Sequence, residues 1–217
     1  MKHKLDFHCH TIASDGGGTI PELISLARTA GLSALILTDH CYTHHCRGSY
    51  FQNLTVIETL RRNKIIDDFP IIVGSEIGTP YSEFLLFGPC AIRSWYENAK
   101  ELERIKDPGE YWLAFKERVV RNYDYAMIMC HPASLVEYLE RLPDTMYELL
   151  HGFEINNSGV DYLKHAPEVV KCLRSRIAHP RELCNSDCHD QELGEQFNEV
   201  DIDKVSEKNV VNWLRRK

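Results

Sequence analysis

The sequence of 217 residues lacks a long apolar run, a signal-peptide pattern and an excess of positive charge. No apolar stretch approaches the roughly 18 residues that a membrane-spanning helix needs. The segment Met1–Asp6 is mostly polar and does not resemble a signal peptide. The formal net charge of −7 disfavours a broad face for long nucleic acids. We therefore expect a protein that neither crosses a membrane nor binds long nucleic acids.

Internal repeats, low-complexity tracts and linker-like segments are also missing, so we expect one domain over residues 1–217. Eight cysteines occur without a secretion signal, which favours reduced thiols and a cytoplasmic location. The chain is 43% hydrophobic, enough to bury a sizeable core. Its length is common among barrels that form a single unit.

Strands and helices are predicted to alternate along the chain. The segment Lys4–His10 is expected to be a strand. Thr19–Glu22 then opens a helix, because its first and last residues form a capping box around a proline suited to the first turn. Gly31 should end this helix, and a second buried strand follows at Ser33–Thr38. This order implies parallel strands with a right-handed crossover.

The alternation continues to the end of the sequence. We predict further strands at 70–75, 83–88, 126–130, 152–156 and 184–187 and further helices at 54–63, 108–122, 134–141, 162–174 and 203–216. This order indicates an α/β fold and favours a small barrel over an open sheet. In such barrels the C-terminal ends of the strands carry the active site. Substrate selectivity is expected in loops at 41–53, 88–107 and 157–165.

Histidines and carboxylates stand at the ends of several apolar strands. His8 and His10 lie on one face of the first strand, because side chains alternate along a strand, and two imidazoles on one face can bind one metal. Asp187 and His189 repeat the spacing at the last strand. Either pair could arise by chance in a chain with 11 histidines. Their shared position at strand ends predicts a multi-metal site.

Four further residues complete the predicted ligand set, namely Asp15, His40, Glu76 and His131. For Asp15, in a loop that ends in three glycines, turn chemistry is the competing explanation. Glu76 ends the run IIVGSE, where an unpaired buried carboxylate would be costly. A bridging position between two metals removes that cost. His40 and His131 each close an apolar run.

Other polar residues give weaker signals. The loop Cys41–Cys46 holds two cysteines and two histidines, but they crowd together, so a polar rim is favoured over a structural zinc clip. Cysteines next to predicted ligands are expected to be small buried residues that face the apolar layer, namely Cys9, Cys130 and Cys188. Glu154 and Asn156 are candidates for three roles: metal ligand, hydrogen-bond partner of a metal ligand, or part of the pocket wall.

The run HCHTIASDGGGTIPELISLARTAGLSALILTDH closely resembles the opening of the PHP (polymerase and histidinol phosphatase) family. GSE, CHP and SDCH match its later motifs in order. The resemblance implies a distorted (β/α)7 TIM-like barrel that holds two or three divalent metal ions, commonly Zn, Mn or Fe. It places His8, His10, Glu76 and Asp187 on one metal, His131 with bridging Glu76 on a second, and Asp15, His40 and His189 on a third. Many members carry a histidine where this chain has Glu83, so the metal count depends on that residue.

The expected function is metal-dependent hydrolysis of a phosphate ester, in which a metal-bridging hydroxide attacks a small phosphomonoester or nucleotide-type substrate. Arg47 and Arg93 are candidate phosphate clamps, although isolated surface arginines are more common. Asp187 or His189 could pass a proton to the leaving oxygen. The alternatives are a phosphodiesterase or nuclease, a protein-tyrosine phosphatase, an amidohydrolase-type enzyme and a catalytically silent metal-binding module. The late Asp-x-His motif favours a phosphoesterase, and the nearly complete ligand set disfavours a silent module.

Overall fold

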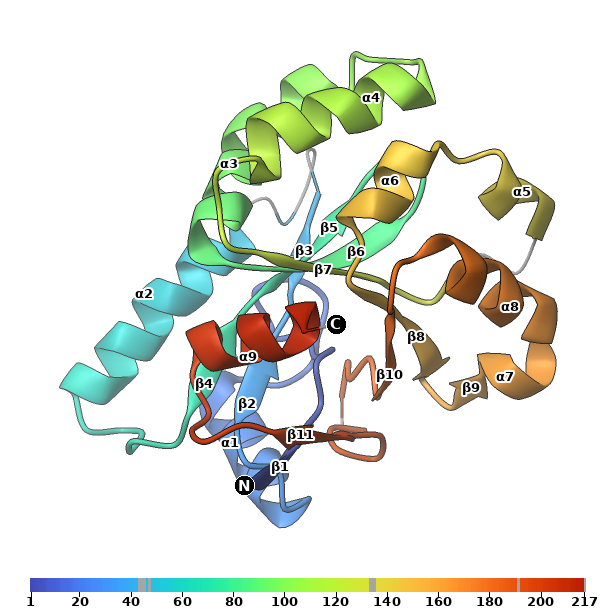
Figure 1. Ribbon diagram of the computed structural model, residues 1–217. Coiled ribbons are helices and arrows are strands. Elements are labelled where there is room, and N and C mark those ends of the chain that lie inside the picture. Colours follow the sequence, from blue (N-terminus) through green and yellow to red (C-terminus); the bar gives the residue numbers. More distant parts are fainter. Residues whose placement is uncertain (43–45, 47, 133–135, 191, 217) are drawn as a thin grey trace.

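The computed structural model describes residues 1–42, 46, 48–132, 136–190 and 192–216. It has a mixed α/β fold in which helices surround a mostly parallel main sheet (Figure 1). Along the order β10-β8-β7-β6-β5-β3, only β6 runs antiparallel to its neighbours. These strands are β3 (His40–Cys41), β5 (Ser75–Gly78), β6 (Glu83–Phe87), β7 (Ala126–Met129), β8 (Gly152–Asn157) and β10 (Arg181–Asn185).

Smaller pairings extend the main sheet. β2 (Leu35–Leu37) runs parallel to β4 (Ile71–Val73), and these strands lead into β3 and β5. β9 (Val160–Asp161) forms an antiparallel pair with β8. β1 (Lys2–Leu5) pairs antiparallel with β11 (Asn198–Asp201), a strand that the sequence did not predict.

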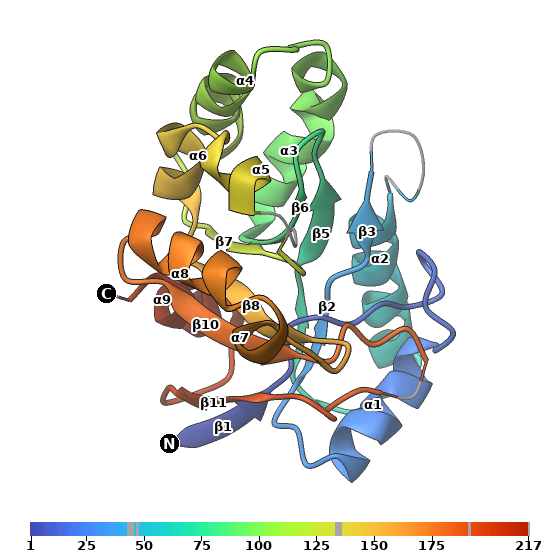
Figure 2. The same cartoon turned by 90° about the vertical axis from the view of Figure 1, so that its right-hand side faces the viewer.

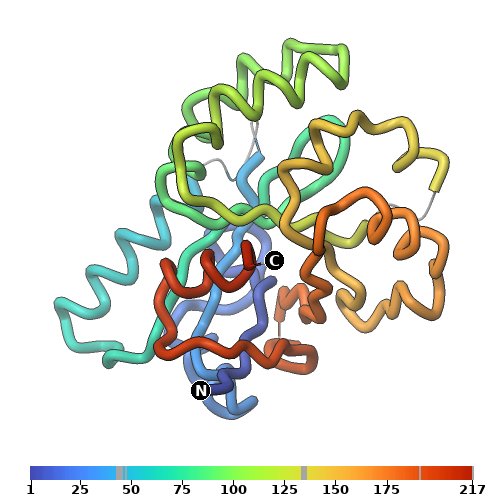
Figure 3. Tube along the Cα trace, in the orientation of Figure 1, coloured from blue at the N-terminus to red at the C-terminus, as the bar shows by residue number. Residues whose placement is uncertain are grey.

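The first strand continues as irregular chain beyond Leu5. The Phe7 amide donates to Oδ1 of Asn185 at 3.0 Å instead of joining a regular ladder. Further on, Cys9 forms an isolated parallel bridge with Cys188. The first ten residues therefore lie beside the segment that follows β10, although the two are far apart in sequence (Figure 3).

The helices pack around the strands, as the two views in Figures 1 and 2 show. None of the described helices is long and apolar enough to cross a membrane. Their bounds are α1 (Ile20–Thr29), α2 (Ser49–Arg62), α3 (Pro89–Leu102), α4 (Pro108–Phe115), the π-helix η1 (Lys116–Val120), α5 (Val136–Glu140), α6 (Asp144–Leu149), α7 (Tyr162–His165), α8 (Pro167–Arg176) and α9 (Glu207–Arg215).

The predicted start and end of α1 are confirmed. The Thr19 amide donates to Glu22 Oε2 at 2.8 Å, which completes the capping box. Gly31 follows the helix with φ +72°, a conformation that glycine adopts without a Cβ penalty. The first helix is thus defined by short-range signals.

Three segments predicted as loops contain regular structure. The segment 88–107 contains α3, because a proline starts the helix and five apolar residues share its buried face, namely Ala91, Ile92, Trp95, Ala99 and Leu102. α2 begins inside 41–53, and β9 and α7 lie within 157–165. The predicted helix 162–174 is interrupted at Ala166, because Pro167 begins a second helix.

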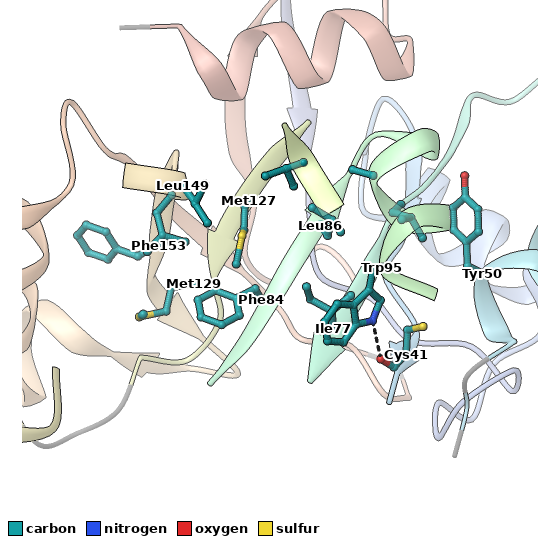
Figure 4. Packing of buried hydrophobic residues seen from close by; sticks show 14 of the residues in the cluster. Cys41, Tyr50, Ile77, Phe84, Leu86, Trp95, Met127, Met129, Leu149 and Phe153 are labelled. Atoms are coloured by element: carbon teal, nitrogen blue, oxygen red, sulfur yellow. Dashed lines mark hydrogen bonds between the residues drawn. The ribbon is translucent and has the colours of Figure 1, made fainter. Parts of the chain in front are cut away.

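Two hydrophobic clusters lie on opposite sides of the main strands. The larger packs beneath the helices, where Trp95 donates its indole N–H to the Cys41 carbonyl at 3.3 Å (Figure 4). The smaller joins strand residues to α9. Met127 and Met129 face the larger cluster, whereas Ile128 and Cys130 face the smaller one.

The prediction for the three cysteines is therefore only partly correct. Cys9 and Cys188 join the larger cluster and are buried as expected. Cys130 instead joins the smaller cluster and lies close to predicted ligands. The assumed alternation fails here because His131 leaves the extended conformation, with φ +22°.

Candidate metal centre

The eight predicted ligands gather at one rim of the sheet, although they come from widely separated segments. Parallel strands deliver their C-terminal ends to the same rim, and the ligands stand at those ends or in the loops that follow. The chain after β1 supplies His8, His10 and Asp15, β3 supplies His40, β5 supplies Glu76, the turn after β7 supplies His131, and the segment after β10 supplies Asp187 and His189.

Glu83 reaches this rim by a different route. β5 and β6 form a hairpin in which the Thr79 amide donates to the Ser82 carbonyl at 3.0 Å, and Gly78 pairs with Glu83. Because β6 runs antiparallel to its neighbours, its first residue, Glu83, lies among the predicted ligands, and its last residue lies at the opposite rim. Glu83 Oε2 is 3.6 Å from His131 Nε2.

Four side-chain atoms form a compact group deep in the site. His8 Nε2 lies 3.3 Å from Glu76 Oε2 and 3.2 Å from Asp187 Oδ1. His10 Nε2 lies 3.4 Å and 3.2 Å from the same two oxygens. Ligands placed about 2.05 Å from a tetrahedral zinc are separated by about 3.3 Å. These distances match that spacing.

The same four atoms are buried and make no hydrogen bond. Buried polar atoms nearly always find a partner, and leaving one unsatisfied costs free energy. A divalent cation would satisfy two neutral imidazoles and two carboxylates at once. The donor set therefore fits a metal ion, which would be held by His8, His10, Glu76 and Asp187.

Two further groups adjoin this one. On one side, His131 Nε2 lies 3.0 Å from Glu76 Oε1, so the two oxygens of Glu76 face different groups. On the other side, Asp15 Oδ2 lies 3.3 Å from His40 Nε2 and 3.4 Å from His189 Nε2. Every predicted ligand thus belongs to a group able to hold a cation.

The charges in the site are strongly coupled. Burial alone would raise the pKa of Glu76, but the imidazoles of His8, His131 and His40 lower it well below its usual range. Burial lowers the pKa of His8, whereas Glu76 and Glu154 raise it, and the net pKa is well above its ordinary value. Protons on these imidazoles stabilise the buried carboxylates, and cations would do the same.

Two of the predicted ligands have strained backbones. His131 and Asp187 have φ angles of +22° and +51°, which few residues other than glycine adopt. Such strain concentrates at functional sites, where the surrounding structure holds it in place. Here it turns both side chains toward the ligand group.

The sequence did not single out Tyr42 or Asp39, although both support the site. The Tyr42 ring stacks on His40 at 4.6 Å between centroids, and its hydroxyl donates to Glu83. Tyr42 stands two residues after His40, so strand alternation could have indicated it. Asp39 accepts from the Thr11 amide at 2.8 Å and binds the loop that carries Asp15.

Of the two candidate phosphate clamps, Arg93 lies away from the predicted ligands. Arg93 is exposed in the first half of α3, which follows the end of β6. That end pairs with Ala126 at the start of β7, so it lies at the opposite rim. Arg47 and residues 43–45 of the loop Cys41–Cys46 fall outside the described residues.

A cavity of about 290 Å³ opens beside Asp187 and His189. Its walls also include serine hydroxyls and acidic side chains, contributed by Ser158, Ser186, Glu192 and Glu195. Among its described lining residues there is no lysine or arginine. A phosphate bound here would have to be neutralised mainly by cations held by the ligands.

One family model and several solved structures match the chain. The model of the PHP domain family matches residues 6–191. A candidate metal-dependent phosphoesterase from Bifidobacterium adolescentis is 16% identical, with a TM-score of 0.59 and coverage of 96% of this chain and 94% of that one. A two-domain protein from Bacteroides vulgatus that contains a candidate PHP-like metal-dependent phosphoesterase is 19% identical, with a TM-score of 0.51 and coverage of 88% and 53%.

A third similar structure is an amidohydrolase from Chromobacterium violaceum with bound sulfate and no metal. It is 15% identical, with a TM-score of 0.52 and coverage of 89% and 90%. At these identities the structures support the fold alone. A comparison with curated proteins gave no match.

Proposed function

The chain belongs to the PHP domain family, and on this basis we propose that it is a metal-dependent phosphoesterase acting on small phosphorylated substrates. The observation that carries the proposal is the group of four buried atoms without hydrogen bonds, spaced as the ligands of one cation. Such a centre is an established means of activating water and neutralising charge in phosphate ester hydrolysis.

We propose at least two divalent cations, Zn, Mn or Fe. The first would be held by His8, His10, Glu76 and Asp187, and the second by His131 and the other oxygen of Glu76. Glu83 would take the place of the family's histidine on the second cation, which its 3.6 Å distance from His131 Nε2 supports.

A third cation is proposed at Asp15, His40 and His189. The Nδ1–H of His189 is 2.9 Å from the Asp187 carbonyl, to which it can donate. With its proton on Nδ1, His189 carries a lone pair on Nε2, the nitrogen that faces Asp15. Asp15 and His189 are each more than two fifths exposed, so this cation would be held less tightly than the first.

We also propose that the strands close into a distorted (β/α)7 barrel. Backbone hydrogen bonds from Thr38 N to Cys9 O and from Glu76 N to Thr38 O, at 2.8 Å and 3.0 Å, join the first three strand segments. His10 N donates to Cys188 O at 2.8 Å, which joins the last segment to the first. This closure would explain why ligands from both ends of the chain share one site.

When bound, the cations would supply a nucleophile near neutral pH and neutralise the charge that develops on phosphorus. Asp187 and His189 line the cavity and would therefore face a substrate bound there. Glu76 and the imidazoles of His8 and His10 lie deeper and would hold a cation away from solvent. The acidic wall formed by Glu192 and Glu195 would repel long polyanions, which favours monoesters or nucleotides over nucleic acids.

The test is elemental analysis of protein purified without chelators, followed by assays with each metal. We expect at least two bound cations per chain and hydrolysis of p-nitrophenyl phosphate. His8→Ala should lose both metal and activity, whereas the matched variant at the exposed His165, His165→Ala, should keep both.

Three results would favour a function other than phosphomonoester hydrolysis. Faster hydrolysis of bis-p-nitrophenyl phosphate would favour a phosphodiesterase. Activity on amides alone would favour an amidohydrolase. Metal-loaded protein that is inert toward every ester tested would indicate a silent module.

A further inference from the structure

Glu154 in β8 is a fully buried carboxylate directly behind the ligands. Its Oε1 lies 2.9 Å from His8 Nδ1 and accepts from Asn185 Nδ2 at 2.8 Å. Its Oε2 accepts from the His131 amide at 2.8 Å and from Asn157 Nδ2 at 2.7 Å. Each oxygen of Glu154 therefore contacts one predicted ligand: Oε1 contacts the His8 imidazole and Oε2 contacts the His131 backbone amide.

We propose that Glu154 is a positioning residue that orients ligands of two different cations, the His8 imidazole and the His131 backbone. This inference rests on the proposed metal centre. Ligating histidines commonly donate their second nitrogen to a carboxylate, which fixes the tautomer and the ring orientation.

At His8 the geometry selects one tautomer. A carboxylate only accepts hydrogen bonds, so the proton belongs on Nδ1, and the lone pair of Nε2 faces Glu76 and Asp187. Asn157 Nδ2 is also near His8 Nδ1, but at 3.4 Å. The shorter contact with the charged acceptor is the stronger one.

At His131 the same carboxylate supports a strained backbone. This residue has φ +22° and precedes Pro132, which further restricts its conformation. The hydrogen bond from the His131 amide to Glu154 holds the turn that directs the imidazole toward Glu76. One carboxylate thus acts on ligands from two strands.

The surroundings of Glu154 are fixed as well. Asn185 Oδ1 accepts from the Phe7 amide at 3.0 Å and from Asn198 Nδ2 at 3.1 Å, so its amide nitrogen must face Glu154. The β8–β10 register shifts between Leu183 and Cys184. A bulge of this kind re-aims side chains, and Asn157 bonds to Glu154, whereas the sequence had indicated Asn156 as the site residue.

The first experiment records the imidazole nitrogens of the zinc-loaded wild-type protein by long-range ¹H–¹⁵N NMR, before and after chelation. The His8 signals are assigned with a His8→Gln variant. We expect His8 to carry a proton on Nδ1 in both states, alone when zinc is bound and together with one on Nε2 after chelation. An Nδ1 without a proton in either state would overturn the proposal, whether or not the protein proves to be a phosphoesterase.

The second experiment compares Glu154→Gln with Asp6→Asn by chelator competition and thermal unfolding. Asp6 is also buried and accepts four hydrogen bonds, from three backbone amides, one of them that of His8, and from a serine hydroxyl, but none from an imidazole. We expect Glu154→Gln to weaken zinc binding about 10–100-fold and to alter the His8 signals. Asp6→Asn should lower the unfolding temperature while leaving the tautomer intact.

Zinc affinity unchanged by Glu154→Gln, or weakened equally by Asp6→Asn, would refute the positioning role while leaving the phosphoesterase proposal standing. Wild-type protein that binds no zinc would instead refute the metal centre itself.

Discussion

The substitution Asp187→Asn tests the deepest cation group with little change in shape. Asp187 Oδ1 lies 3.2 Å from both His8 Nε2 and His10 Nε2. Asparagine tolerates the positive φ of this position almost as well as aspartate. The variant should therefore fold and lose mainly the negative charge that faces the cation.

The expected effect follows from linkage between metal binding and folding. Zinc at 100 times its dissociation constant stabilises a protein by about 2.7 kcal/mol. An affinity loss of about 100-fold, the upper range for losing even an outer partner, leaves about 0.4 kcal/mol. At about 2–4 °C per kcal/mol for a chain of this size, the variant should lose about 5–9 °C of the zinc-induced rise in unfolding temperature.

The assay is thermal unfolding with and without zinc, with Asp190→Asn as the matched control. Asp190 is exposed and lies three residues further along the same segment, so its variant should respond to zinc as the wild-type protein does. An undiminished zinc-induced shift in Asp187→Asn would refute the ligand assignment. Equal losses in both variants would show that charge near the site, not ligation, accounts for the effect.

Three further predictions concern parts of the fold around the centre. Burial lowers the pKa of His151 to about 4, below its ordinary 6.5, so its contribution to stability should be lost as the pH falls from 6.5 to 4. His151→Gln should reduce this loss by about 2 kcal/mol after allowance for partial exposure, measured by urea unfolding at pH 7 and pH 4.5. A Cβ on Gly78 would lie 2.2 Å from the Tyr42 ring, so Gly78→Ala should cost about 1–3 kcal/mol of overpacking in the same assay. Thr19→Ala should cost about 1 kcal/mol through loss of the capping box, and an unchanged unfolding midpoint would contradict it.

The candidate ligands could be predicted from the sequence because most of them stand where an apolar strand ends, and Asp15 lies in the loop after the first of these strands. The motifs around His8 and Asp187 are short, and parallel strands necessarily bring such ends to one rim. The structure accordingly brings together all eight predicted residues. Their assignment to individual cations remains a prediction.

The features that escaped prediction depend on long-range or non-periodic structure. The reversal of β6 follows from a hairpin, and strand patterns alone do not give direction. Cys130 faced the unexpected side because the strand bends at His131, and alternation holds only along regular strands. Glu154 was a candidate for three roles, but its partners lie 146 and 23 residues away in sequence, so short motifs could not choose among them.

The deepest cation group also bears on how the chain acquires its site. Its ligands span His8 to Asp187, so nearly the whole chain must be synthesised before they can meet. Contacts between such distant residues form slowly, because closing a long loop costs entropy before any bond repays it. A cation bound there would join the two ends of the chain much as a cross-link does. Chains that end before Asp187 should therefore neither retain metal nor gain the resistance to unfolding that metal confers.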